Sequence, residues 1–175
     1  MSLTPMPKLK PKPLVMNPVP KPDTIEDHIE RLGIVLPIAA APVAAYVATV
    51  EAAGLLHVSG QLPFNNGQLM VGRLGEDRDI AYGEQAARAC GLMILAQIKA
   101  ALGGFERVER IVKLNIFVNS DARFTDQPKV GNGASELMVE VFGEAGKHAR
   151  AAVGVPTLPL GAAVEVDAIV ALKAA

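Results

Sequence analysis

The stretch from Ile80 to about Leu102 carries its apolar residues at the period of an α-helix, and it constrains the fold more than any other segment. A helix with one long apolar side has to cover that side against a sheet or another helix. The pair Gly103–Gly104 ends the pattern. The single cysteine, Cys90, lies inside this helix and is expected to be a small core residue. The apolar side consists of Ala86, Ala89, Met93, Leu95, Ile98 and Leu102.

Segments on both sides of this helix have the composition of β-strands. The triplet Asn65-Asn66-Gly67 predicts a hairpin turn before the helix. A second amphipathic helix is expected over residues 135–143. The order β-β-β-α-β-α-β-β predicts an α+β fold with two helices on one face of a mixed six-stranded sheet. The expected strands span residues 43–51, 55–63, 68–75, 109–120, 149–155 and 163–172.

The N-terminus has a different composition from the rest of the chain. Residues 1–22 hold seven of the thirteen prolines, several lysines and no acidic residue. Such a segment favours an extended arm over helix or central strand. A short helix should follow, with Asp23 and Glu26 as its capping box and Gly33 at its end. We therefore expect an arm over 1–22 and a single domain over 23–175.

Composition excludes several classes of partner. The net charge of −1 attracts neither nucleic acid nor an anionic membrane. Five Phe, two Tyr and no Trp leave few aromatic rings for stacking on RNA bases. One cysteine forms no internal disulfide, and no apolar run reaches the ~20 residues of a membrane-spanning helix. The expectation is a soluble cytoplasmic protein without nucleic-acid or membrane partners.

Motifs for nucleotide, zinc or serine-hydrolase sites do not occur in the sequence, so no metal or cofactor is expected. Three features remain as candidates. Tyr46 stands on an expected strand of small residues, and Ser59-Gly60 ends the next one. Arg150 heads the penultimate strand among small neighbours, and Glu165 lies on the last strand. A guanidinium so placed can bind a carboxylate in bidentate fashion, although the spacing alone favours a structural salt bridge or a rim charge.

Three segments together resemble a known family. They are "YVATVEAAGLLHVSGQLP", "VKLNIFVNSDARF" and "ARAAVGVPTLPLGAAVEVDAIV". The chain resembles the RidA family, also called YjgF or endoribonuclease L-PSP, from roughly Ala40 to Leu172. The stretch "FTDQPKVGNGASELMVEVFGEAGKHARAAVG" resembles a bacterial branch of that family with longer chains.

The resemblance implies a chorismate-mutase-like fold and a homotrimer with ligand clefts between subunits. It further implies hydrolysis of reactive enamines and imines, such as 2-aminoacrylate, to 2-keto acids and ammonia without a cofactor. By position, Arg150 would bind the substrate carboxylate and Glu165 would orient water. Tyr46 would hydrogen-bond the amine or the water, and Ser59 and Gly60 would face the ligand. A cysteine frequent in the family two residues after the arginine is Ala152 here.

Two other classes of function stay open at this stage. A non-catalytic trimer that binds keto acids would need Arg150 but not Glu165. A ribonuclease or translation inhibitor would need a basic surface, which the sequence offers only in the arm.

Register sets a distance between Arg150 and Glu165. If residues 156–163 formed a plain hairpin, Arg150 would face Ile169, four residues or about 13 Å from Glu165. One small substrate does not span that distance. We therefore expect the two residues to meet across a subunit boundary.

Overall fold

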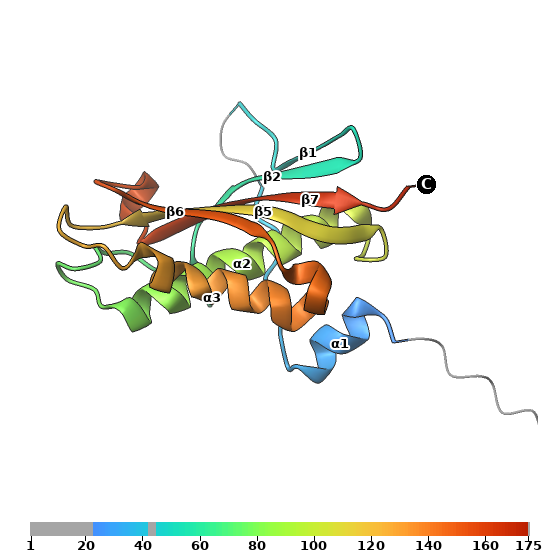
Figure 1. Cartoon of the computed structure of the whole chain (residues 1–175), viewed down its shortest axis with the longest axis horizontal. Coiled ribbons are helices and arrows are strands. Elements are labelled where there is room, and N and C mark those ends of the chain that lie inside the picture. Colours follow the sequence, from blue (N-terminus) through green and yellow to red (C-terminus); the bar gives the residue numbers. More distant parts are fainter. Residues whose placement is uncertain (1–22, 42–44, 175) are drawn as a thin grey trace, which may run out of the picture.

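The computed structural model describes residues 23–41 and 45–174, so the expected arm over 1–22 lies outside the described residues. One mixed sheet has helices α2 and α3 on one face, and within the described ranges no helix lies on its other face (Figure 1). The α+β architecture with two helices on one face is as expected. No helix in the described ranges is long and apolar enough to cross a membrane. The helices are α1 (Ile25–Arg31), α2 (Ile80–Leu102) and α3 (Gln127–Phe142), with 3₁₀ turns η1 (Gly143–Gly146) and η2 (Pro159–Gly161).

The main sheet has five strands in the order β1-β2-β7-β5-β6, not the six expected. The expected strand over 68–75 is reduced to two residues, because Gly72 and Gly75 turn the backbone with φ of 129° and 81°. Those two residues form a separate small hairpin with β3. The strands are β1 (Thr49–Ala52), β2 (Leu55–Gln61), β3 (Phe64–Asn65), β4 (Gln68–Leu69), β5 (Val108–Asn119), β6 (Ala149–Val155) and β7 (Val164–Leu172).

Strands β6 and β7 do not form the hairpin that the register argument assumed. Strand β5 lies between them, parallel to β6 and antiparallel to β7. The connection over 156–163 instead passes the end of β5 and contains η2, in which Leu160 has a φ of 57°. As a result β6 is an edge strand, and Arg150 pairs with Leu114 rather than facing Ile169.

The first helix begins one residue later than the sequence indicated. Thr24, not Asp23, is the N-cap: its hydroxyl accepts from Asp27 N–H at 3.1 Å, and the Asp27 carboxylate accepts from Thr24 N–H at 2.9 Å. Asp23 pairs with Arg31 at 2.9 Å instead. Glu26 accepts from the Phe105 N–H at 2.9 Å, which ties α1 to the end of α2.

The core lies between the sheet and the two helices. Alternate residues of β7 (Val164, Val166, Ala168 and Val170) are buried against the helices. Cys90 is fully buried, and its thiol contacts the Val164 carbonyl at 3.6 Å. Burial raises the pKa of this thiol well above its usual value, so Cys90 is the small core residue that the helical pattern predicted.

Glycines let α2 and α3 approach closely. A Cβ added at Gly133 of α3 would lie 1.9 Å from the Glu84 carbonyl oxygen of α2. At Gly91 of α2, an added Cβ would lie 2.9 Å from a Leu137 methyl. The helix pair therefore packs backbone against backbone near Gly133, which brings the N-terminal half of α3 down onto the sheet.

Gly133→Ala should destabilise the fold by about 1–3 kcal/mol, because the backbone carbonyl of Glu84 occupies the space of the new methyl group. The higher helix propensity of alanine offsets only part of this steric cost. Urea unfolding measures the change. Glu136→Ala, at an exposed position of the same helix, is the control and should shift stability by less than about 0.5 kcal/mol. Equal stability of Gly133→Ala and wild type would contradict the close packing.

Candidate functional site

The five predicted site residues fall into two groups, and the two charged ones, Arg150 and Glu165, lie on opposite faces of the sheet. Leu114, which pairs with Arg150, is fully buried beneath the helices, so Arg150 shares the helix-covered face. Phe117 pairs with Glu165 and points to the uncovered face. The two residues also lie on opposite sides of β5 and three residues apart along it, about 10 Å in each direction. Within one chain they do not share a small ligand.

Arg150 lies under the N-terminal half of α3. Its Nη1 donates to Asn132 Oδ1 at 3.0 Å and to Ser135 Oγ at 3.1 Å, and its Nη2 donates to the Pro128 carbonyl at 3.1 Å. The missing side chain of Gly131 leaves room for the group, since an added Cβ would stand 3.3 Å from Nη1. These contacts hold the guanidinium plane while leaving Nε–H and one N–H of Nη2 without a protein partner among the described residues.

Every acceptor that Arg150 contacts is a neutral oxygen. No ion pair among the described residues includes Arg150, although the side chain is only partly exposed. A structural salt bridge, which the sequence left open, is therefore not what holds it. A half-buried guanidinium without a counter-charge is a strong point of attraction for a carboxylate.

Glu165 lies against the end of β2. Its carboxylate occupies the space that a side chain at Gly60 would fill, since an added Cβ there would meet Oε1 at 2.0 Å. Gly60 falls in the irregularity of the β2–β7 register between Val58 and Gln61. Burial, and next the neighbouring charge of Asp167, raise the pKa of Glu165 above its ordinary value. The carboxyl is thus poised as a base closer to neutral pH than a free glutamate.

Tyr46 and Gly60 line one pocket together with Gln61 and Gln97. Tyr46 is half exposed and stands in a bend, because β1 begins only at Thr49 and not at residue 43. The Ser59 hydroxyl donates to the Val47 carbonyl at 2.8 Å. Ser59 therefore holds the segment that carries Tyr46. Its hydroxyl proton is donated to Val47, so this hydroxyl can only accept a hydrogen bond from a ligand.

The predicted site residues thus lie in two separate clusters. We call Arg150 with Asn132, Ser135 and His148 the arginine half-site. We call Glu165 with Gly60 and the adjoining Ser59 and Tyr46 the glutamate half-site. Sequence reasoning missed Ser135 and His148, which belong to different elements and share no motif. The described residues contain no group of three or more His, Cys, Asp or Glu able to hold a metal ion.

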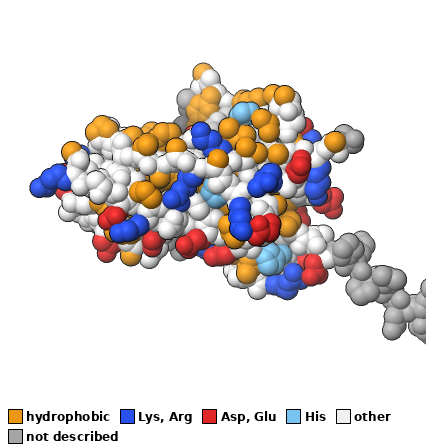
Figure 2. All heavy atoms as spheres, viewed as in Figure 1, with side chains coloured by type: hydrophobic (Ala, Val, Ile, Leu, Met, Phe, Trp, Pro, Cys, Tyr) orange, Lys and Arg blue, Asp and Glu red, His pale blue; other side chains and the backbone are white. Residues whose placement is uncertain are grey.

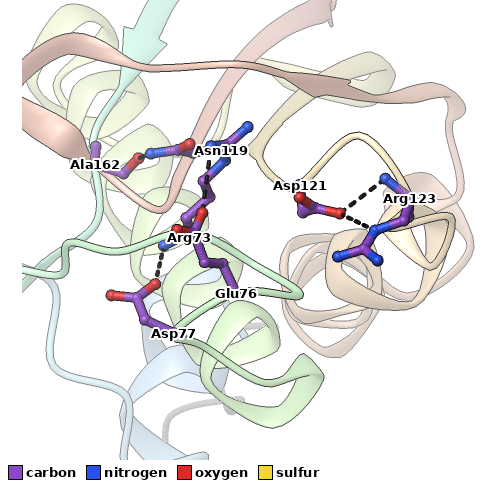
Figure 3. Close-up of polar contacts among 7 residues, drawn as sticks. All are labelled: Arg73, Glu76, Asp77, Asn119, Asp121, Arg123 and Ala162. Carbon is purple, nitrogen blue, oxygen red and sulfur yellow. Dashed lines mark hydrogen bonds and ion pairs between the residues drawn. The ribbon is translucent and has the colours of Figure 1, made fainter.

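Another polar cluster lies where the loop before α2 meets the end of β5 (Figure 3). Arg73 pairs with Glu76 at 3.2 Å, and Asp121 accepts from Arg123 Nε at 3.1 Å. Arg73 Nε and Asn119 Oδ1 are buried without a hydrogen-bond partner among the described residues. None of the predicted site residues belongs to this cluster, which ties the loop to β5 through the Leu74 N–H and the Asn119 carbonyl, 2.9 Å apart.

Comparison with known proteins extends these observations. Residues 26–172 match the family model described as "YjgF/chorismate_mutase-like, putative endoribonuclease". Protein TCP17 of Trypanosoma cruzi is 56% identical over 148 residues, covering 83% of this chain and 92% of that protein. A 2-iminobutanoate/2-iminopropanoate deaminase of Dermatophagoides farinae is 26% identical over 139 residues, covering 78% of this chain and 93% of that protein.

A solved structure agrees with the sequence matches. The protein Atu1372 of Agrobacterium tumefaciens, whose function is unknown, is 46% identical with a TM-score of 0.78. The alignment covers 85% of this chain and 93% of that one. The sequence match and the common fold therefore extend over the whole region that carries both half-sites.

Asp167→Asn should lower the pKa of Glu165, because it removes the like charge while its amide oxygen can still accept from Asn115 Nδ2, now 2.8 Å from Asp167. A carboxyl ¹³C NMR titration measures the change, with Glu165→Gln identifying the signal. In wild type the raised pKa favours the protonated form of Glu165. The substitution lowers this pKa, so Glu165 should remain a carboxylate down to a lower pH. The distant Asp23→Asn should leave the titration unchanged, and a Glu165 pKa that stays constant in Asp167→Asn would refute the assigned cause.

Proposed function

The chain belongs to the YjgF/RidA family of chorismate-mutase-like proteins, and from this premise we propose that it hydrolyses small enamines and imines of 2-amino acids to 2-keto acids and ammonia. The observation that carries the proposal is the uncompensated guanidinium of Arg150, pre-positioned by three neutral oxygens. The similarity to a deaminase at 26% identity supports the reaction class.

The substrate carboxylate binds the free Nε–H and Nη2–H edge of Arg150. Protonation of the enamine carbon gives the imine, whose carbon is then attacked by water. Glu165 accepts the proton of that water, and its raised pKa suits the task. Glu165 passes this proton to the nitrogen of the carbinolamine. The carbon–nitrogen bond then breaks as the hydroxyl loses its proton and becomes the keto oxygen, and ammonia is released. Tyr46, beside Gly60 in the same pocket, hydrogen-bonds the amine or the attacking water.

The reaction requires the two half-sites to come from different subunits. We propose a homotrimer in which the arginine half-site of one subunit faces the glutamate half-site of the next. The position of Arg150 on the edge strand β6 supports this arrangement, because an edge is accessible to a neighbour. The uncovered sheet face supports it as well: Val50 and Val153 are 50% and 47% exposed there. Figure 2 shows hydrophobic side chains gathered on this upper side of the molecule.

Arg150→Ala should lower kcat/KM for pyruvate formation from dehydratase-generated 2-aminoacrylate by roughly a hundredfold or more, since two charge-assisted hydrogen bonds are lost. Glu165→Gln should lower kcat by about 10²–10⁴ while leaving keto-acid affinity nearly intact. A coupled lactate dehydrogenase assay measures the rates. Arg123→Ala, at a highly exposed arginine outside both half-sites, serves as the matched control.

Undiminished turnover in Arg150→Ala would refute the mechanism. Binding of keto acids that depends on Arg150, with no turnover above the spontaneous rate in wild type, would instead favour the non-catalytic binding protein.

A further inference from the structure

Ser135 and His148 form a hydrogen-bonded pair in the arginine half-site. The proposed deamination uses Ser135 only to position Arg150 and gives His148 no role. Ser135 Oγ lies 3.0 Å from His148 Nε2, and His148 Nδ1 lies 2.6 Å from the Gly146 carbonyl. A carbonyl oxygen only accepts, so Nδ1 carries the imidazole proton and Nε2 accepts the serine hydroxyl. The hydroxyl proton therefore already points at a base whose tautomer is held by a third group.

A positive charge stands beside the same oxygen. Arg150 Nη1 donates a hydrogen bond to Ser135 Oγ at 3.1 Å. His148 Nε2, in contrast, accepts a hydrogen bond from the same hydroxyl. As the hydroxyl proton moves to His148, the guanidinium stabilises the negative charge that develops on Oγ. Burial, and more weakly the charge of Arg150, lower the pKa of His148 below its ordinary value of 6.5, against the raising effect of the Gly146 hydrogen bond. The imidazole is consequently neutral, as a base has to be, at physiological pH.

Both residues are reachable from solvent. Ser135 and His148 are half-buried and line a groove between α3 and the edge strand β6, together with Val139 and Lys147. Glu136 and Glu140 also line the groove. The negative charge of Glu140 is partly neutralised, because its carboxylate accepts two hydrogen bonds from the Arg88 guanidinium, at 2.8 and 3.2 Å. An apolar wall, a nucleophile and nearby cations suit an ester with a small acyl group.

We propose that Ser135 is a nucleophile activated by His148 and that this groove is an acyl-transfer site for small carboxylic esters. Ser135 Oγ attacks the ester carbonyl and passes its proton to Nε2, and the free N–H groups of Arg150 stabilise the oxyanion. The bond to the alcohol then breaks, with the proton returned from His148 to the leaving oxygen. Water, deprotonated by His148, adds to the acyl-serine and releases the acid. The net reaction consumes only ester and water.

The chemistry is separate from imine hydrolysis, since it needs Ser135 and His148 and makes no use of Glu165. The two proposals therefore fail separately: Glu165→Gln should abolish deamination and leave ester cleavage unchanged.

The full chain is incubated with p-nitrophenyl acetate, nitrophenol release is followed, and the acetylated residue is located by peptide mass spectrometry. Wild type should carry acetyl on Ser135. Ser135→Ala should lose that label and lower the rate to at most about a tenth, whereas Ser135→Cys should be acylated at the new thiol. Ser120→Ala, a buried serine of the other polar cluster, is the matched control and should match wild type.

His148→Gln should slow acetylation of Ser135 by about tenfold or more, with thermal unfolding verifying that the variant is folded. The exposed His57→Gln, on the uncovered face of the sheet, controls for loss of a histidine. Acetylation confined to Lys147 or other lysines, or a Ser135→Ala rate equal to wild type, would overturn the proposal. The paired Ser135 variants decide the matter even where His148→Gln does not fold.

Discussion

The guanidinium of Arg150 is the interaction on which the functional part of this structure depends. Pro128, Asn132 and Ser135 present three neutral oxygens from one helix, and Gly131 leaves the room beneath that helix for the group. Desolvating a cation without a counter-charge costs stability, and hydrogen bonds to neutral oxygens offset only part of that cost. A fold that retains such an arrangement holds the charge ready for an anionic ligand. The close packing of α3 on α2 keeps the three acceptors in place.

The sheet separates this charge from Glu165, the base of the proposed reaction. Arg150 lies on the helix-covered face of an edge strand, whereas Glu165 lies on the uncovered face, across β5. Under the proposed mechanism, neither half-site alone has all the groups that enamine hydrolysis needs. Association of subunits through the uncovered face and the β6 edge would complete both at once, and it would cover the apolar residues exposed there.

Regular elements with a strong period were predictable from the sequence. The helix Ile80–Leu102 and the strand Ala149–Val155 have the expected bounds. The family assignment was also correct. Non-local pairing was not predictable, because nothing within residues 149–172 indicates that β5 inserts between β6 and β7. The sequence predicted that Arg150 and Glu165 are too far apart within one chain to share a small substrate, and the structure agrees. The register behind that prediction was wrong, because the two residues lie on opposite faces of the sheet and on opposite sides of β5. Ser135 and His148 escaped notice because their contact arises only when α3 packs beside the edge strand.

Subunit complementation tests the central claim, that one active cleft takes Arg150 and Glu165 from different chains. Arg150→Ala and Glu165→Gln chains, each inactive alone, are co-expressed with different tags, and the mixed assemblies are purified and verified by native mass spectrometry. Every mixed cyclic trimer has both intact residues in one of its three clefts, so the deaminase activity of the purified mixed assemblies should return to about a third of wild type. Mixed assemblies that form but stay as inactive as either parent would contradict the account.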